Sequence, residues 1–174
     1  GGSGMIGALA VTKAAPDGHT LLLGSAGETA INAFVYKNKM QYQPAKDLAP
    51  ITLVTRVPNV LVAAPNFPAN NLKEFIEYAR NANPPLAYAS GGNGSQHHLA
   101  MEMLKRAAGF DMVHVPYKGG GPATLALIAN EVQAAFGGNS VSGQVKAGKI
   151  RAAALAGRKR TNAYPDLPTI SETY

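Results

Sequence analysis

Tyr88-Ala-Ser-Gly-Gly-Asn-Gly-Ser-Gln-His-His98 reads as a short apolar strand that passes through a glycine-rich turn and opens a helix. His114-Val-Pro-Tyr-Lys-Gly-Gly-Gly-Pro-Ala123 follows with the same layout. Glycine lets a backbone approach a ligand closely and adopt a positive φ. The helix behind such a turn offers free N–H groups and a partial positive charge, which together hold an anion. The two units therefore predict a site for a small acidic ligand that needs no catalytic side chain.

The same layout recurs along the chain, so the units define a fold class. Residues 19–24 are expected to form a strand that runs into a Gly/Ser turn and a helix over residues 28–35. Further strands are expected at residues 60–64, 86–89, 112–115, 133–136 and 150–156. Strands that alternate with helices at this spacing predict α/β architecture with parallel sheets. Ligands of such sheets bind beyond the carboxyl ends of the strands, where all three glycine turns lie.

Two local signals add detail to this expectation. Residues 51–64 contain two β-rich runs joined by Pro58-Asn59, which favours a long extended segment able to cross between domains. Asn71 and Glu74 have the spacing of a helix N-cap and its reciprocal partner, and the apolar residues that follow recur at helical spacing. We therefore expect an amphipathic helix to begin after Asn71.

Composition excludes several classes of protein. The chain has 174 residues, 46% of them hydrophobic, with a net charge of +6 and no cysteine. Disulfides and thiolate metal sites are therefore absent. A chain without cysteine is compatible with either the cytoplasm or the periplasm. No apolar run reaches about 18 residues, the length that would indicate a membrane span. Gly1-Gly-Ser-Gly4 lacks the charged beginning of a signal peptide.

Two other functions remain as alternatives. The glycine turns could belong to an enzyme that acts on a small acidic metabolite, but residues 90–95 contain no titratable side chain. Arg158-Lys159-Arg160 could serve a nucleic-acid-binding module, but it is not interleaved with aromatic residues and is typical of a solvated loop. His97 and His98 are adjacent and diverge by about 100° on a helix, which argues against a shared metal ion. We expect no metal, no cofactor and no catalytic residue.

The candidate ligand-binding residues are small hydroxyl, amide and glycine residues of the three turns, with one histidine, one phenol and one ammonium beside them. Neutral donors at helix starts are suited to carboxylate recognition. The residues are Ser25, Ala26, Gly27, Ser90, Gly91, Gly92, Asn93, Gly94, Ser95, His98, Tyr117, Lys118, Gly119 and Gly120.

These motifs resemble the tripartite tricarboxylate transporter receptor family, the Bug-type periplasmic solute-binding proteins. The matching stretches occur in the order of the family and cover essentially the whole chain; they are residues 15–27, 46–51, 88–99, 114–123, 146–152 and 165–169. The resemblance implies two α/β domains of the periplasmic binding protein type II kind around a ligand cleft. It also implies a non-enzymatic receptor that captures a small carboxylate, often a dicarboxylate, and delivers it to membrane transporter subunits.

The resemblance further implies a domain division. Residues 1–58 would belong to domain 1 and residues 59–137 to domain 2, and residues 138–174 would return to domain 1. Family members are longer at both ends, so we expect an internal part of a receptor whose first domain is incomplete. Association through the exposed edge of that domain is then expected.

Overall fold

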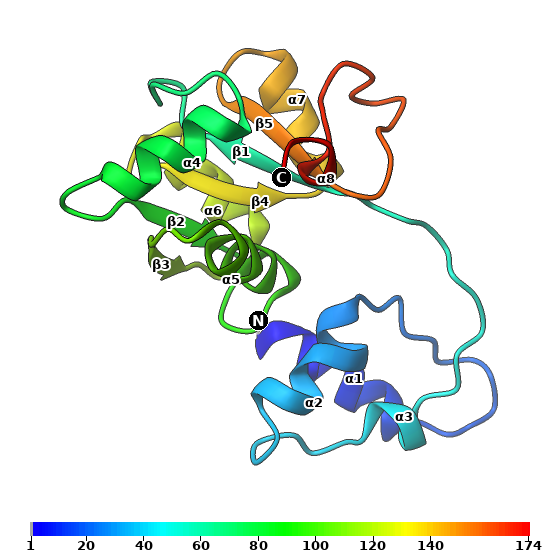
Figure 1. Cartoon of the computed structure of the whole chain (residues 1–174). Coiled ribbons are helices and arrows are strands. Elements are labelled where there is room, and N and C mark those ends of the chain that lie inside the picture. Colours follow the sequence, from blue (N-terminus) through cyan, green and yellow to red (C-terminus); the bar gives the residue numbers. More distant parts are fainter. Residues whose placement is uncertain (1) are drawn as a thin grey trace.

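A five-stranded sheet lies at the centre of the larger of two lobes (Figure 1). The computed structural model describes residues 2–174. The strands are β1 (Asn59–Ala63), β2 (Ala87–Ser90), β3 (Val113–Pro116), β4 (Ala134–Gly137) and β5 (Arg151–Ala156), in the order β3-β2-β4-β1-β5. The expected α/β class is confirmed, but the sheet is not purely parallel.

The antiparallel strand is β1, whereas β2 is parallel to both β3 and β4. At the start of β1 Val60 lies opposite Gly137, the last residue of β4. The chain therefore enters the sheet at the edge where β4 ends, and β1 has to run against its neighbours. The side chains of Val60, Leu61 and Val62 are all fully buried, which explains the uninterrupted apolar run of this strand.

Helices cover both faces of the sheet. The helices of the larger lobe are α4 (Leu72–Asn81), α5 (Gln96–Ala108), α6 (Gly120–Ile128), η3 (Asn139–Val141), α7 (Ser142–Lys146) and α8 (Ile170–Thr173). Leu61 and its core neighbours pack against α4 and α5, whereas Val60 and Val62 pack against α6 on the other face. In the described residues no helix is long and apolar enough to cross a membrane.

The observed helix caps agree closely with those expected from the sequence. The Asn71 side chain accepts a hydrogen bond from the Glu74 N–H at 3.0 Å, as expected of an N-cap. The Glu74 carboxylate reaches back to the Asn70 N–H at 2.7 Å, one residue earlier than expected. Gly109 ends α5 in the left-handed conformation with φ 64°, which favours glycine there.

The smaller lobe contains helices without an assigned strand in residues 2–58. Its helices are η1 (Gly2–Gly4), α1 (Met5–Thr12), the π-helix η2 (Gly27–Ile31), α2 (Asn32–Val35) and α3 (Pro44–Asp47). The strand expected at residues 19–24 is therefore wrong: this stretch is not paired, and Leu23 is 83% exposed. Backbone N–H and C=O groups form a strand only against a neighbouring strand, and the described residues place none beside this stretch.

An extended segment joins the lobes, as the β-rich run with Pro58 indicated. Residues 48–58 contain neither helix nor strand and run along one side of the molecule (Figure 1). The return to the first domain expected from residue 138 differs from the structure. β5 pairs with β1, and α8 packs against α4 and β5, so residues 151–156 and 170–173 lie in the larger lobe. The apolar run of β5 completes the sheet beside β1, which would otherwise be its edge strand.

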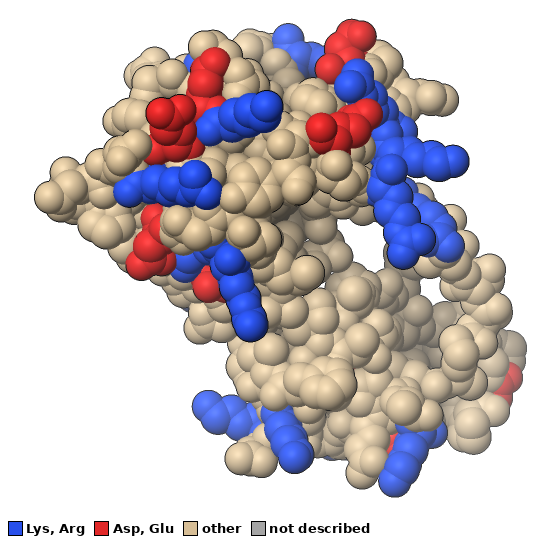
Figure 2. Space-filling view, viewed as in Figure 1, with Lys and Arg blue, Asp and Glu red and all other residues tan. Residues whose placement is uncertain are grey.

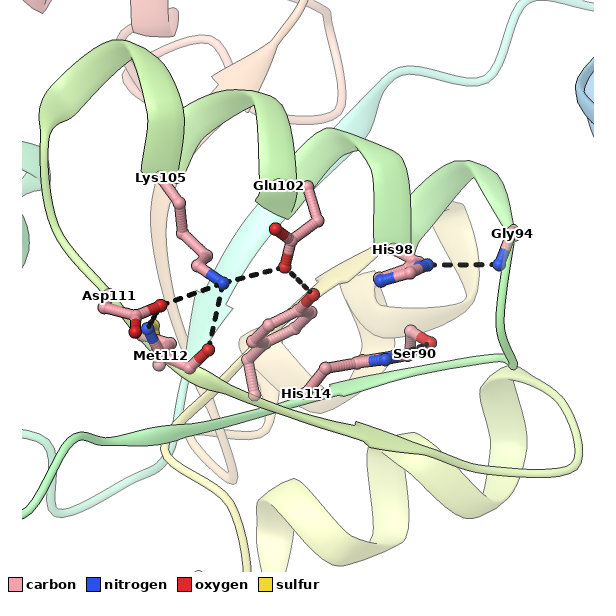
Figure 3. A network of polar contacts seen from close by, with 9 residues as sticks. Ser90, Gly94, His98, Glu102, Lys105, Asp111, Met112 and His114 are labelled. Atoms are coloured by element: carbon pink, nitrogen blue, oxygen red, sulfur yellow. Dashed lines mark hydrogen bonds and ion pairs between the residues drawn. The ribbon is translucent and has the colours of Figure 1, made fainter. Parts of the chain in front are cut away.

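A polar network beneath the first glycine turn holds α5 against β2 and β3 (Figure 3). The rings of His98 and His114 stack with centroids 3.9 Å apart. His114 Nε2 lies 2.7 Å from Ser90 Oγ, and the Gly94 N–H donates to His98 Nδ1 at 3.1 Å. Farther along α5, Glu102 accepts from the Tyr88 hydroxyl at 2.5 Å. The network therefore connects the helix and two strands to the backbone of the turn.

We expect the free energy of unfolding to decrease as the pH falls from 6.5 to about 4. Burial and the adjacent His98 lower the pKa of His114 from 6.5 to about 4, while Glu102 acts in the opposite direction and Lys105 in the same one. Within this interval the unfolded chain binds a proton that the folded chain excludes, so acid favours unfolding. The Tyr88 ring also stacks on His114, and its pKa is raised by burial.

The measurement is the thermal unfolding midpoint across this pH interval. His114→Asn is expected to flatten the dependence, and His19→Asn is the matched control because His19 is an exposed loop residue. Burial lowers the pKa of His98 as well, so some dependence will persist in the variant. A His114→Asn protein with the full wild-type slope would contradict the assignment.

Candidate ligand-binding cleft

The turn after β2 is shaped by its glycines and by a serine beneath it. Gly92 has φ 128° and Gly94 has φ 72°, backbone conformations that other residues rarely adopt. Ser90 is 1% exposed, and its Oγ accepts from the Gly92 N–H at 3.1 Å. Ser95 then caps α5 by accepting from the His98 N–H at 3.3 Å. The sequence therefore builds a rigid turn whose outer surface is backbone.

The turn after β3 packs directly on this first turn. The Tyr117 N–H donates to the Ser90 carbonyl at 2.9 Å, which extends the pairing of the two parallel strands. A Cβ added to Gly91 would lie 3.4 Å from the Gly119 carbonyl carbon, so the two turns approach backbone to backbone. Gly119 precedes α6, and no side chain caps this helix. The first N–H groups of α6 are thus open toward any acceptor in front of them.

A third turn comes from the smaller lobe. The two carboxylate oxygens of Glu28 accept from the Ser25 N–H at 2.6 Å and from the Ser25 hydroxyl at 2.8 Å. The Ser25 hydroxyl oxygen also accepts from the Gly27 N–H at 3.3 Å. These bonds tie Ser25 to the first residues of η2.

The two lobes meet at the backbone carbonyl of Asn93. The Tyr36 hydroxyl donates to this oxygen at 2.6 Å, and the Ser3 hydroxyl donates to it at 3.0 Å. A Cβ on Gly94 would lie only 2.9 Å from the Val35 side chain, so glycine is needed for this approach. The first glycine turn therefore contacts the other lobe as well as the space between the lobes.

The three turns enclose a cleft of ≈ 1110 Å³, including the space open to solvent at its mouth. Ten residues of its wall were expected from the sequence: Ser25, Gly27, Gly91, Gly92, Asn93, Ser95, Tyr117, Lys118, Gly119 and Gly120. Six others were not: Ser3, Gly4, Glu28, Tyr36, Gln96 and His97. Hydrogen bonds across the lobes place Ser3 and Tyr36, and no local pattern reveals these two, whereas Gln96 and His97 directly follow Ser95 at the start of α5.

Four expected residues lie outside this wall: Ala26, Ser90, Gly94 and His98. Ser90 is buried under the turn, and His98 faces His114 while it holds the Gly94 N–H. These two side chains support the turn rather than face the cleft. The difference between His97 and His98 follows from the 100° step between adjacent helix positions.

His97 lines both the cleft and a second, smaller cavity of ≈ 330 Å³. Its Nε2 is buried and has no hydrogen-bond partner among the described residues. Burial lowers the pKa of His97, so the ring is neutral at pH 7. A neutral imidazole can donate at one nitrogen and accept at the other. Within residues 2–174 no group of three His, Cys, Asp or Glu side chains could hold a metal ion.

Comparison with known proteins identifies the family. The sequence model of the tripartite tricarboxylate transporter family receptor matches residues 1–174. A UPF0065 protein of Bordetella pertussis is 38% identical, and the match covers 93% of this chain and 50% of that protein. The chain spans about half the length of the curated relatives it matches.

Solved structures agree with this match. An R. palustris protein solved with adipate has a TM-score of 0.90 at 35% identity, over 99% of this chain and 57% of that one. MatC of Rhodopseudomonas palustris, solved with bound malate, has a TM-score of 0.85 at 33% identity, over 99% and 58% of the two chains. Sequence and structure therefore agree over nearly the whole chain, which belongs to the tripartite tricarboxylate transporter receptor family.

Proposed function

We propose that this chain forms the ligand cleft of a periplasmic solute-binding receptor that captures a small carboxylate and delivers it to membrane transporter subunits. The observation that carries the proposal is the uncapped start of α6, which opens onto the cleft beside Lys118 and the start of α5. A carboxylate in front of α6 would accept hydrogen bonds from its first N–H groups and meet the positive end of the helix dipole. The adipate and malate carried by two similar structures are carboxylates of suitable size.

An enzyme acting on an acidic metabolite is less consistent with the geometry. Ser95 and His98 are one hydroxyl–imidazole pair at the turn, but each is engaged with the backbone. Ser95 Oγ caps α5 and His98 Nδ1 accepts from the Gly94 N–H. Ser90 and His114 form a second pair, with 2.7 Å between Oγ and Nε2, but Ser90 is buried beneath the turn and both residues lie outside the cleft wall. A nucleophile needs an adjacent base that is free to take its proton. Binding without chemistry therefore accounts for the arrangement better.

The direct test is ligand-dependent stabilisation of the full-length protein that contains residues 1–174. Thermal unfolding would be followed with a panel of mono- and dicarboxylates that includes adipate and malate. A ligand that binds only the folded state stabilises it by about 2.7 kcal/mol at 100 times its Kd. A selective shift with particular acids would support the proposal, and a flat response to the whole panel would contradict it.

A negative charge at the start of α6 is expected to weaken carboxylate binding at least about tenfold. A Cβ added to Gly120 would meet only open space, so Gly120→Asp fits without a clash. Like charges about 4 Å apart near a protein surface repel by about 4 kcal/mol, and 1.4 kcal/mol already corresponds to tenfold. The added carboxylate also favours the helix start, so the variant should remain folded.

Isothermal titration of Gly120→Asp against wild type measures this effect. Gly120→Asn tests whether charge rather than size is responsible. Gly143→Asp is the matched control, because Gly143 lies in the first turn of α7, outside the cleft wall, with similar free space. Equal affinities of wild type and Gly120→Asp would exclude the start of α6 as the carboxylate site.

Loss of the Tyr36 hydroxyl is expected to accelerate ligand release about two- to twelvefold, because a net hydrogen bond contributes about 0.5–1.5 kcal/mol. Tyr36→Phe removes one of the two donors to the Asn93 carbonyl and so weakens the contact between the lobes. Stopped-flow dissociation measures the rate. Tyr78→Phe on α4, outside the cleft wall, is the control. An unchanged rate in Tyr36→Phe would show that this contact does not retain the ligand.

A further inference from the structure

Glu28 is a carboxylate in a cleft otherwise suited to anions. It is half-buried and is the one acidic side chain in the described cleft wall. None of the ion pairs in the described part of the chain includes it. An acidic side chain at this position disfavours an anionic group on the smaller lobe, so a plain dicarboxylate does not match the whole cleft.

The hydrogen bonds of Glu28 leave it able to accept more. Each of its two oxygens takes one bond from Ser25, whereas a carboxylate offers about four acceptor positions. A Cβ on Gly4 would lie 2.7 Å from Oε2 of Glu28, so the glycine is what allows the carboxylate to sit at this wall. The bonds to Ser25 account for one acceptor on each oxygen, and the remaining acceptors are open to a donor from solvent or from a ligand in the cleft.

The charge of the opposite wall has the other sign. Lys118 is exposed and stands in the turn before α6, whose first N–H groups carry no side-chain cap. Lys118 and Glu28 are the lining residues with a formal charge, since His97 is neutral. The described residues thus give the cleft a positive wall in the larger lobe and a negative wall in the smaller lobe. A ligand with one anionic and one cationic end would satisfy both walls.

We propose that the ligand of this cleft is a small carboxylate that also carries a cationic amine, with its carboxylate at the start of α6 and its ammonium against Glu28. The inference rests on the proposed function and narrows its ligand class. An ammonium group has three donors, which suits the free acceptors of a carboxylate. Hydrogen bonds between charged partners are about twice as strong as neutral ones.

Matched ligand pairs test the inference in the full-length protein. 6-Aminohexanoate replaces one carboxylate of adipate by a CH2–NH3⁺ group at nearly constant length, and 4-aminobutanoate does the same for succinate. We expect titration calorimetry at pH 7 to show at least about tenfold tighter binding of the amino acid within a pair, equivalent to about 1.4 kcal/mol.

Glu28→Gln is the decisive variant. The glutamine carbonyl can accept from the Ser25 N–H, and its amide can donate to the Ser25 hydroxyl, so both contacts with Ser25 survive while the charge is lost. In this variant the dissociation constants of the two ligands of a pair are expected to differ by less than about twofold, equivalent to less than about 0.4 kcal/mol. Glu77→Gln, an exposed residue of α4, is the control and should leave the preference unchanged.

The outcomes separate the two proposals. Equal or tighter binding of the dicarboxylates by wild type, or a preference unaltered in Glu28→Gln, would overturn the inference while the carboxylate receptor stands. Failure of every carboxylate to bind, with or without an amine, would overturn the proposed function and the inference with it. An unchanged unfolding midpoint of Glu28→Gln would exclude misfolding as the cause of a lost preference.

Discussion

Parallel pairing of β2 with β3 is the constraint on which the cleft depends, because it brings the ends of both strands to one edge of the sheet. Tyr88 lies opposite His114, and Ser90 opposite Pro116, so the two glycine turns start at the same level. A shift of this register by one residue would turn every side chain of β3 to the opposite face. The stacked rings and the Ser90–His114 contact oppose such a shift, since they exist only in the observed register (Figure 3).

The turns themselves leave backbone exposed because their glycines are used for close approach. Gly91 packs against Gly119, and Gly94 packs against Val35 of the other lobe. Side chains at these positions would separate the turns or the lobes. The wall of the cleft combines glycine backbone and serine hydroxyls with a few larger polar side chains, and such neutral donors are suited to an anion. Among the described residues of the wall, Glu28 and Lys118 carry a formal charge.

Much of the larger lobe could be predicted from the sequence, because signals such as the cap at Asn71 and the αL residue Gly109 are local. The antiparallel direction of β1 and the place of β5 beside it depend on pairing between distant segments. Local sequence patterns do not indicate such pairing, so the sequence analysis expected residues 138–174 to return to the first domain. Residues 19–24 have the composition of a buried strand, yet a strand forms only beside another. In the cleft, Tyr36 contacts Asn93, which lies 57 residues later in the sequence, and no local motif predicts this contact.

The distribution of surface charge differs between the two lobes. Acidic and basic side chains are interspersed over the larger lobe, whereas the visible charges of the smaller lobe are mainly basic and lie along its lower edge (Figure 2). On the larger lobe Arg160 pairs with Glu172 at 3.2 Å, so one residue of the basic run at residues 158–160 holds the C-terminal helix. Glu28 forms no ion pair within the described residues, so no paired cation of the protein neutralises its charge in the cleft. Exclusion of water from the cleft would strengthen the electrostatic effect of Glu28 on a bound ligand.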